Sequence, residues 1–147
     1  VCDAIGAHAG GFNNPPDDWV DAQTVETSTF KGHPSFYFRR LEQLREIMVL
    51  SGDSEKRIWV TEFGWSTNNL AKGYEYGKDN TDADQANYLV RAFQLAREWG
   101  WVDGMFVWNL NFQQVVPATD EKFPFGIVRP DGSPRPAYIS LKFMTKH

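Results

Sequence analysis

The chain has 147 residues and a formal net charge of −4, because 19 Asp and Glu residues outnumber 15 Lys and Arg residues. Hydrophobic residues make up 41% and charged residues 23%, a globular composition that excludes disorder and a coiled coil. The sequence contains no basic block and no apolar run of about 20 residues. We therefore expect neither a nucleic-acid partner nor a membrane-spanning helix.

The first part of the chain predicts a strand, a long loop, a helix and a second strand. Residues 2–8 are apolar without helical periodicity, which indicates a strand, and the loop after them is rich in Asn, Pro, Asp and Gly up to Pro34. Ser35 is a suitable N-cap for a helix that runs to about Leu50 with apolar residues at helical spacing. The β-branched and aromatic run Ile58–Phe63 predicts the second strand.

The same order of strand, loop and helix continues to the end of the chain. A polar loop leads to a helix that Thr81 and Asp84 cap at its start and that Gly100 ends. Residues 104–110 predict a third strand, and a last helix begins with Pro136 and extends to about residue 146.

Apolar strands that alternate with amphipathic helices predict an α/β fold with a parallel sheet and right-handed crossovers. In each unit the long loop follows the strand, as in (β/α)8 barrels, whose active sites are built from these loops. Three units do not close an eight-stranded barrel, and alone they would leave two sheet edges open. We therefore expect the chain to be part of a larger TIM-barrel domain.

Glu62 is the first candidate for chemistry. Side chains alternate along a strand, so Glu62 is predicted to share a face with Ile58 and Val60. An unpaired carboxylate on such an apolar face costs on the order of several kcal/mol, which favours a functional role. The other interpretation is a structural ion pair with Arg57, Arg129 or a further arginine.

Two more candidates end the other predicted strands. His8 could donate a hydrogen bond to a hydroxyl or orient a carboxylate near Glu62, or it could be an ordinary hydrogen-bonding residue. Trp108 could pack in the core or present its ring to the C–H face of a sugar. Because the ends of parallel strands meet at one edge of a sheet, the three residues are expected to converge.

Other mechanisms find no support in the sequence. There is no G-x-S-x-G elbow, P-loop, H-E-x-x-H motif or G-x-G-x-x-G motif. His8, His33 and His147 are too dispersed to suggest a metal site, and Cys2, the lone cysteine, forms no intrachain disulfide.

The segment Ile58–Ser66, with the sequence I-W-V-T-E-F-G-W-S, resembles the seventh strand of retaining glycoside hydrolases of clan A. Residues 2–8 resemble the sixth strand, residues 104–109 the eighth, and residues 125–138 the end of these barrels. Cellulase-like proteins near families 5 and 39 are the most similar. The resemblance implies that residues 1–147 form the C-terminal part of one TIM-barrel domain, strands six to eight, and that the missing N-terminal portion of the barrel completes the fold.

The resemblance also implies a function. Glu62 would be the catalytic nucleophile of a double displacement on β-glycosidic bonds of oligo- or polysaccharides. His8, Trp108, Trp65 and Asn109 would bind the carbohydrate substrate, and no metal or organic cofactor would be needed. The acid/base Glu of this clan follows an Asn at the end of the fourth strand, which this chain lacks, so the isolated chain is expected to be inactive. Secretion would suit such an enzyme.

The family often has a Tyr two residues after the sixth-strand His, and this Tyr donates a hydrogen bond to the nucleophile. Gly10 stands at that position here, so Tyr74, Tyr76 or another group would have to supply the bond. Two other classes of protein remain open. One is a non-catalytic carbohydrate-binding or interaction protein on a TIM-barrel scaffold, which would lack the Asn-Glu pair on strand four. The other is an unrelated α/β domain, an independently folded monomer in which Glu62 belongs to an ion pair.

Overall fold

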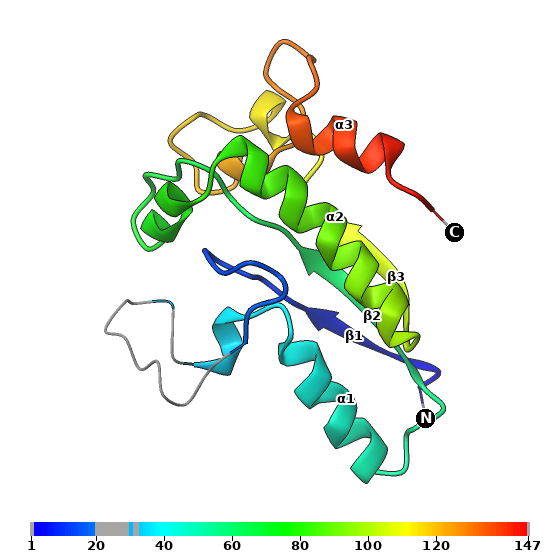
Figure 1. The fold of residues 1–147 in the computed structure, drawn as a ribbon. Coiled ribbons are helices and arrows are strands. Elements are labelled where there is room, and N and C mark those ends of the chain that lie inside the picture. The colour runs from blue at the N-terminus through cyan, green and yellow to red at the C-terminus, as the bar shows by residue number, and fades with distance from the viewer. Residues whose placement is uncertain (1, 20–29, 31–32, 147) are drawn as a thin grey trace.

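Three parallel strands form one sheet in the order β1–β2–β3 (Figure 1). The structure is a computed structural model, and it describes residues 2–19, 30 and 33–146. The strands are β1 (Ala4–His8), β2 (Arg57–Phe63) and β3 (Val102–Val107). This confirms the predicted α/β class and the parallel pairing of all three strands.

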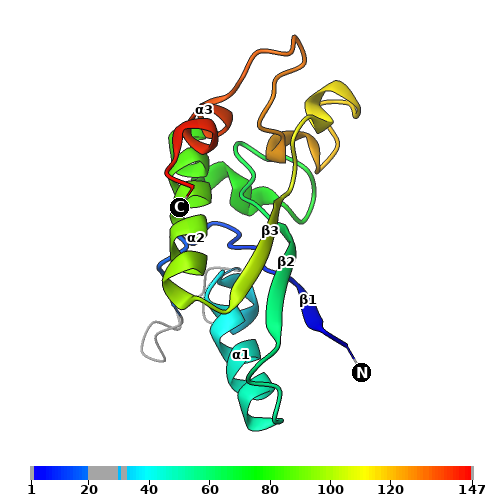
Figure 2. The same cartoon turned by 90° about the vertical axis from the view of Figure 1, so that its right-hand side faces the viewer.

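Helices follow each strand in the chain. The α-helices of the described residues are α1 (Arg40–Leu50), α2 (Asp82–Trp99) and α3 (Pro136–Phe143). Short 3-10 helices lie in the loops that follow the strands: η1 (Pro34–Phe36), η2 (Glu75–Asp79), η3 (Phe112–Gln114) and η4 (Phe123–Phe125). Figure 2 shows α1 and α2 on the same side of the sheet, with α3 beside α2.

Only one face of the sheet is covered within the described residues. Ile58 and Val60 of β2 are fully buried in the core beneath α1 and α2. On the opposite face, Trp59 is 46% exposed and Phe106 is 51% exposed, with 6.2 Å between their ring centroids. The sheet therefore presents an uncovered apolar face opposite its helices.

The helix α2 begins and ends as predicted. The Thr81 hydroxyl accepts a hydrogen bond from the backbone N–H of Asp84, and the Asp84 carboxylate accepts one from the backbone N–H of Thr81. The Asp84 carboxylate also accepts a hydrogen bond from the Thr81 hydroxyl, and this bond, together with the one from the Thr81 backbone N–H, lowers the pKa of Asp84. Gly100 ends the helix with a φ of +66°, a conformation that glycine adopts without strain.

The helix α1 begins later than predicted. His33, not Ser35, caps the first turn, through a hydrogen bond from the Ser35 backbone N–H to His33 Nδ1. That turn is the 3-10 helix η1, and the extended Tyr37 follows it before α1 starts at Arg40. Tyr37 and Phe38 are both buried, so packing of these rings draws the chain out of helical conformation.

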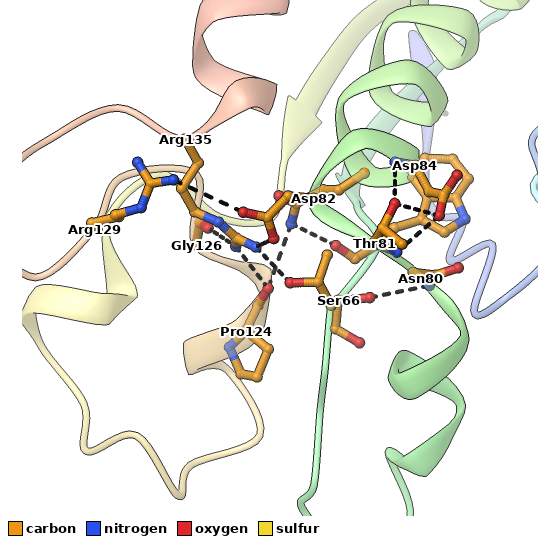
Figure 3. A network of polar contacts seen from close by, with 12 residues as sticks. Ser66, Asn80, Thr81, Asp82, Asp84, Pro124, Gly126, Arg129 and Arg135 are labelled. Carbon is orange, nitrogen blue, oxygen red and sulfur yellow. Dashed lines mark hydrogen bonds and ion pairs between the residues drawn. The ribbon is translucent and has the colours of Figure 1, made fainter.

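A buried guanidinium ties two loops to the start of α2 (Figure 3). Arg135 is 5% exposed, and its Nη1 donates hydrogen bonds to the carbonyl oxygens of Pro124 and Gly126. Its Nη2 donates to Thr67 Oγ1 and to Asp82 Oδ1. Arg135 therefore joins the loop after β3 to the loop after β2.

We predict that Arg135→Lys lowers the free energy of unfolding by about 2–3 kcal/mol, because lysine cannot reach four acceptors in a planar array and leaves buried oxygens unpaired. Thermal or denaturant unfolding measures this change. Arg129→Lys is the control, because Arg129 lies 3.9 Å from the same Asp82 but is partly exposed, and it should cost less than about 1 kcal/mol. Equal losses in the two variants would contradict the structural role of Arg135.

Candidate active site

Glu62 lies at the end of β2 beside an irregularity in the sheet. Ala7 of β1 pairs with Val60, but the next residue, His8, pairs with Glu62, so the register shifts by one. Phe63, not Glu62, then takes the buried place in line with Val60, and the Glu62 side chain is 39% exposed. The prediction that Glu62 shares the buried face of Val60 and Ile58 is wrong, because the bulge interrupts the alternation of side chains.

His8, Glu62 and Trp108 all border one cavity at the carboxyl ends of the three strands. His8 Nδ1 lies 3.8 Å from Glu62 Oε2. Trp108 follows β3, and its backbone N–H donates a 2.7 Å hydrogen bond to the carbonyl oxygen of Phe63. The cavity has a volume of about 570 Å³. The residues that line it are His8, Gly10, Phe12, Ser35, Phe36, Arg40, Glu62, Phe63, Gly64, Gly73, Tyr74, Tyr76, Trp108, Glu121, Lys122 and Phe125.

Gly64 allows β2 and the segment after β3 to approach closely beside Glu62. A Cβ atom at position 64 would lie 2.1 Å from the backbone carbonyl oxygen of Trp108, a distance that no side chain tolerates. The absence of a side chain at Gly64 therefore lets Trp108 sit next to the end of β2.

Trp65, predicted to bind substrate, lies in the core. Its side chain is fully buried, and its Nε1 donates a hydrogen bond to the carbonyl oxygen of Asn14. The indole ring packs on Gly11, where an added Cβ would lie 2.3 Å from the ring. The structure therefore does not bring Trp65 to the cavity.

Asn109, also predicted to bind substrate, is buried and does not line the cavity. Its Nδ2 donates to the carbonyl oxygen of Lys122, and its Oδ1 accepts from the backbone N–H of Phe112. Both bonds hold the loop after β3, so Asn109 positions Lys122 at the cavity rim rather than reaching into the cavity itself.

The loop after β2 contributes two tyrosines to the cavity. Tyr74 and Tyr76 lie with 5.9 Å between their ring centroids, and both line the cavity, as Gly10 does. Burial raises the pKa of Tyr76 well above its ordinary value, and the nearby Tyr74 adds to this effect. The Tyr76 phenol therefore stays neutral and can act as a hydrogen-bond donor.

Charged side chains border the cavity in the segments that follow β1 and β3. Arg40 opens α1, and Glu121 and Lys122 belong to the loop after β3. A hydrogen bond to Glu121 raises the pKa of Lys122, with Asp120 contributing, so Lys122 stays protonated. Local sequence does not mark these residues, because only the folded loops bring them to the cavity.

The arginines considered as structural partners of Glu62 form other contacts. Arg57 Nε lies 3.9 Å from Asp103 Oδ1, and Arg129 Nη2 lies 3.9 Å from Asp82 Oδ2. Among the described residues neither arginine pairs with Glu62, whose carboxylate lies beside the His8 ring instead. This geometry favours a chemical role for Glu62 over a structural ion pair.

Phe12 lines the cavity in an unfavourable backbone conformation. Its φ is +55°, which costs a residue with a side chain roughly 1–2 kcal/mol. Asn80 Nδ2 holds this turn by donating to the carbonyl oxygens of Phe12 and Ser66. Phe12 could not be singled out from the sequence, because a phenylalanine in the left-handed region has no local signature.

The two described histidines have separate surroundings: His8 lies beside Glu62, whereas His33 caps η1. Across residues 2–19, 30 and 33–146, no group of three or more His, Cys, Asp or Glu side chains is placed to hold a metal ion. Within the same residues, no helix is both long enough and apolar enough to cross a membrane.

Neither a family model nor a curated protein sequence matches the chain. Its fold is similar to part of a family 39 glycoside hydrolase from Bacteroides cellulosilyticus WH2, with 24% sequence identity and a TM-score of 0.56 over 92% of this chain and 25% of that chain. The β-glucuronidase from Ruminococcus gnavus is 18% identical, with a TM-score of 0.56 over 96% of this chain and 22% of that one. The β-glucuronidase from Bifidobacterium dentium is 17% identical, with a TM-score of 0.52 over 95% and 20%. The chain thus spans a quarter or less of the length of these glycosidases and shares the fold of that part.

We predict that Gly64→Ala displaces Trp108 and destabilises the protein by on the order of 1–3 kcal/mol, because the new methyl group would collide with the Trp108 carbonyl oxygen. Thermal unfolding measures the loss, and a crystal structure shows the displacement. Gly6→Ala in β1 is the matched control, because its Cβ would meet Thr61 at an ordinary 3.7 Å. An undisturbed Trp108 in Gly64→Ala would show that the close approach is not required.

Proposed function

We propose that this chain is the nucleophile-bearing part of a retaining glycoside hydrolase that acts on β-glycosidic bonds. The observation that carries the proposal is the convergence of His8, Glu62 and Trp108 on one cavity at the carboxyl edge of a parallel sheet. Active sites of (β/α)8 barrels occupy this edge. A carboxylate, an imidazole and an indole ring are the groups that such a site needs.

The fold similarity to glycosidases supports the same function. A family 39 glycoside hydrolase and two β-glucuronidases share the fold of nearly the whole chain. We infer that β1, β2 and β3 are strands six, seven and eight of a TIM barrel. The exposed Trp59 and Phe106 on the uncovered face of the sheet would then lie in the barrel interior, packed by the strands of the N-terminal portion.

In this mechanism Glu62 attacks the anomeric carbon and forms a covalent glycosyl-enzyme intermediate. A second carboxyl group, from the N-terminal portion of the barrel, protonates the leaving oxygen and then activates a water molecule. Retention requires the two carboxyl groups to lie roughly 5–5.5 Å apart. This chemistry uses no cofactor, and without the second carboxyl group residues 1–147 alone would not hydrolyse a glycoside.

His8 and Trp108 would hold the sugar at this nucleophile. The His8 ring is 67% exposed and lies close enough to Glu62 to contact either the carboxylate or a hydroxyl group of the substrate. The half-buried Trp108 ring packs edge-on against Phe112, with 5.0 Å between centroids. This contact would fix the orientation of an apolar surface for the C–H face of the sugar.

We predict that Glu62→Gln in the intact protein that contains this chain lowers turnover at least about a thousandfold, because glutamine cannot act as the nucleophile. Binding of the sugar should persist, because the isosteric amide preserves the shape of the cavity. Hydrolysis of a panel of 4-nitrophenyl β-glycosides measures turnover, and calorimetry measures binding. Glu55→Gln is the matched control: Glu55 is exposed and precedes the opposite end of the same strand.

Undiminished turnover in Glu62→Gln would refute the assignment of the nucleophile. An intact protein that binds carbohydrate but has no hydrolytic activity, and no Asn-Glu pair at the end of its fourth strand, would instead be a carbohydrate-binding protein on a barrel scaffold.

A further inference from the structure

One wall of the cavity is built from aromatic rings of all three loops. We call Phe12, Phe36, Tyr74, Tyr76 and Phe125 the aromatic wall. Consecutive rings touch: Phe36 to Phe12 at 5.0 Å between centroids, Phe12 to Tyr76 at 4.9 Å, Tyr76 to Tyr74 at 5.9 Å and Tyr74 to Phe125 at 6.5 Å. The wall is therefore a continuous row of rings rather than scattered apolar residues.

Phe12 occupies the middle of this row. Its backbone is held in the left-handed region, with a φ of +55°, by the Asn80 side chain. Gly10 lies directly beside this ring, because an added Cβ there would be in ordinary van der Waals contact with it at 3.5 Å. Strained backbone of this kind is concentrated at functional sites, where the surrounding structure maintains it.

Phe30 packs against the rings of the aromatic wall but does not itself face the cavity. Its ring stacks on Phe12 at 5.4 Å and contacts Phe36 and Tyr76, but it does not line the cavity. Phe30 therefore supports the cluster from behind. A change at Phe30 disturbs the packing of Phe12 without removing a ring from the cavity surface.

The chemistry of the aromatic wall differs from that of the sugar-binding surface proposed for Trp108. Three of its five rings are phenylalanines, which have no polar atom to satisfy the hydroxyl groups around a sugar. Tyr76 is only 8% exposed. A flat apolar ring can stack on such a surface or meet it edge-to-face without leaving a polar group unpaired.

We propose that the aromatic wall binds an aromatic aglycone, so that the substrate is an aryl β-glycoside. Phe12 is the specificity-determining residue. The attachment of the aryl group to a sugar rests on the proposed function. The affinity of the aromatic wall for an aryl group does not depend on that function.

Calorimetric titration of the intact protein tests the inference with three probes: 4-nitrophenyl β-D-glucopyranoside, methyl β-D-glucopyranoside and 4-nitrophenol. All titrations use the Glu62→Gln background, so that no probe is hydrolysed. We expect Phe12→Gly, which also relieves the backbone strain, to weaken both aryl probes about tenfold and to change methyl glucoside binding less than about twofold.

Phe30→Leu is the matched control, and we expect it to weaken the aryl probes less than about threefold. Circular dichroism shows whether each variant folds, and if Phe12→Gly does not, Phe36→Leu replaces it as the change in the wall. Absence of 4-nitrophenol binding, equal losses in the wall variant and Phe30→Leu, or an equal loss for the methyl glucoside would each overturn the proposal. If Glu62→Gln abolishes hydrolysis but 4-nitrophenol does not bind, the proposed function stands. Only the proposal of an aromatic aglycone is then overturned.

Discussion

The buried Arg135 guanidinium is the interaction on which the shape of the site depends. A guanidinium taken out of water must find acceptors for its donors, or the cost of desolvation is not offset. Here the acceptors come from the loop after β2, the loop after β3 and the first turn of α2. Gln85 reinforces this arrangement, because its Nε2 donates to the carbonyl oxygens of Trp65, Pro124 and Phe125. The two loops therefore form one unit, which places Trp108 and the tyrosines around Glu62.

Adjacent residues at the end of β2 have different roles. A bulge turns Glu62 out of the buried row and leaves Phe63 in the core. Gly64 permits the close approach of the Trp108 backbone, and Trp65 anchors the loop after β1 through Gly11. Only Glu62 faces the cavity as a group for chemistry, and the rest of the motif maintains its position.

Much of the fold could be predicted from local patterns in the sequence. The capping residues of α2 and the apolar strands are local signals, and the parallel sheet follows from their order. The start of α1 could not be predicted, because burial of Tyr37 and Phe38 overrides the cap at Ser35. The face of Glu62 also depends on a register shift that only the pairing with β1 produces.

The site could be predicted only in part. The ends of parallel strands converge by necessity, so His8, Glu62 and Trp108 meet as expected. Loop residues such as Phe12 gave no signal, because the fold alone decides which of them reach the cavity. Trp65 is the reverse case. Its sequence context predicted a contact with the substrate, but its ring packs on Gly11 in the loop after β1.

The most direct test of the account is to identify the residue that forms the covalent intermediate. The intact protein is incubated with a panel of activated 2-deoxy-2-fluoro β-glycosides, whose glycosyl-enzyme intermediates hydrolyse slowly, and peptide mass spectrometry then locates the attached sugar. The account predicts one sugar on the peptide that contains Glu62, and no label in Glu62→Gln. A sugar attached to another carboxylate, or hydrolysis of the parent glycosides without any covalent label, would contradict it.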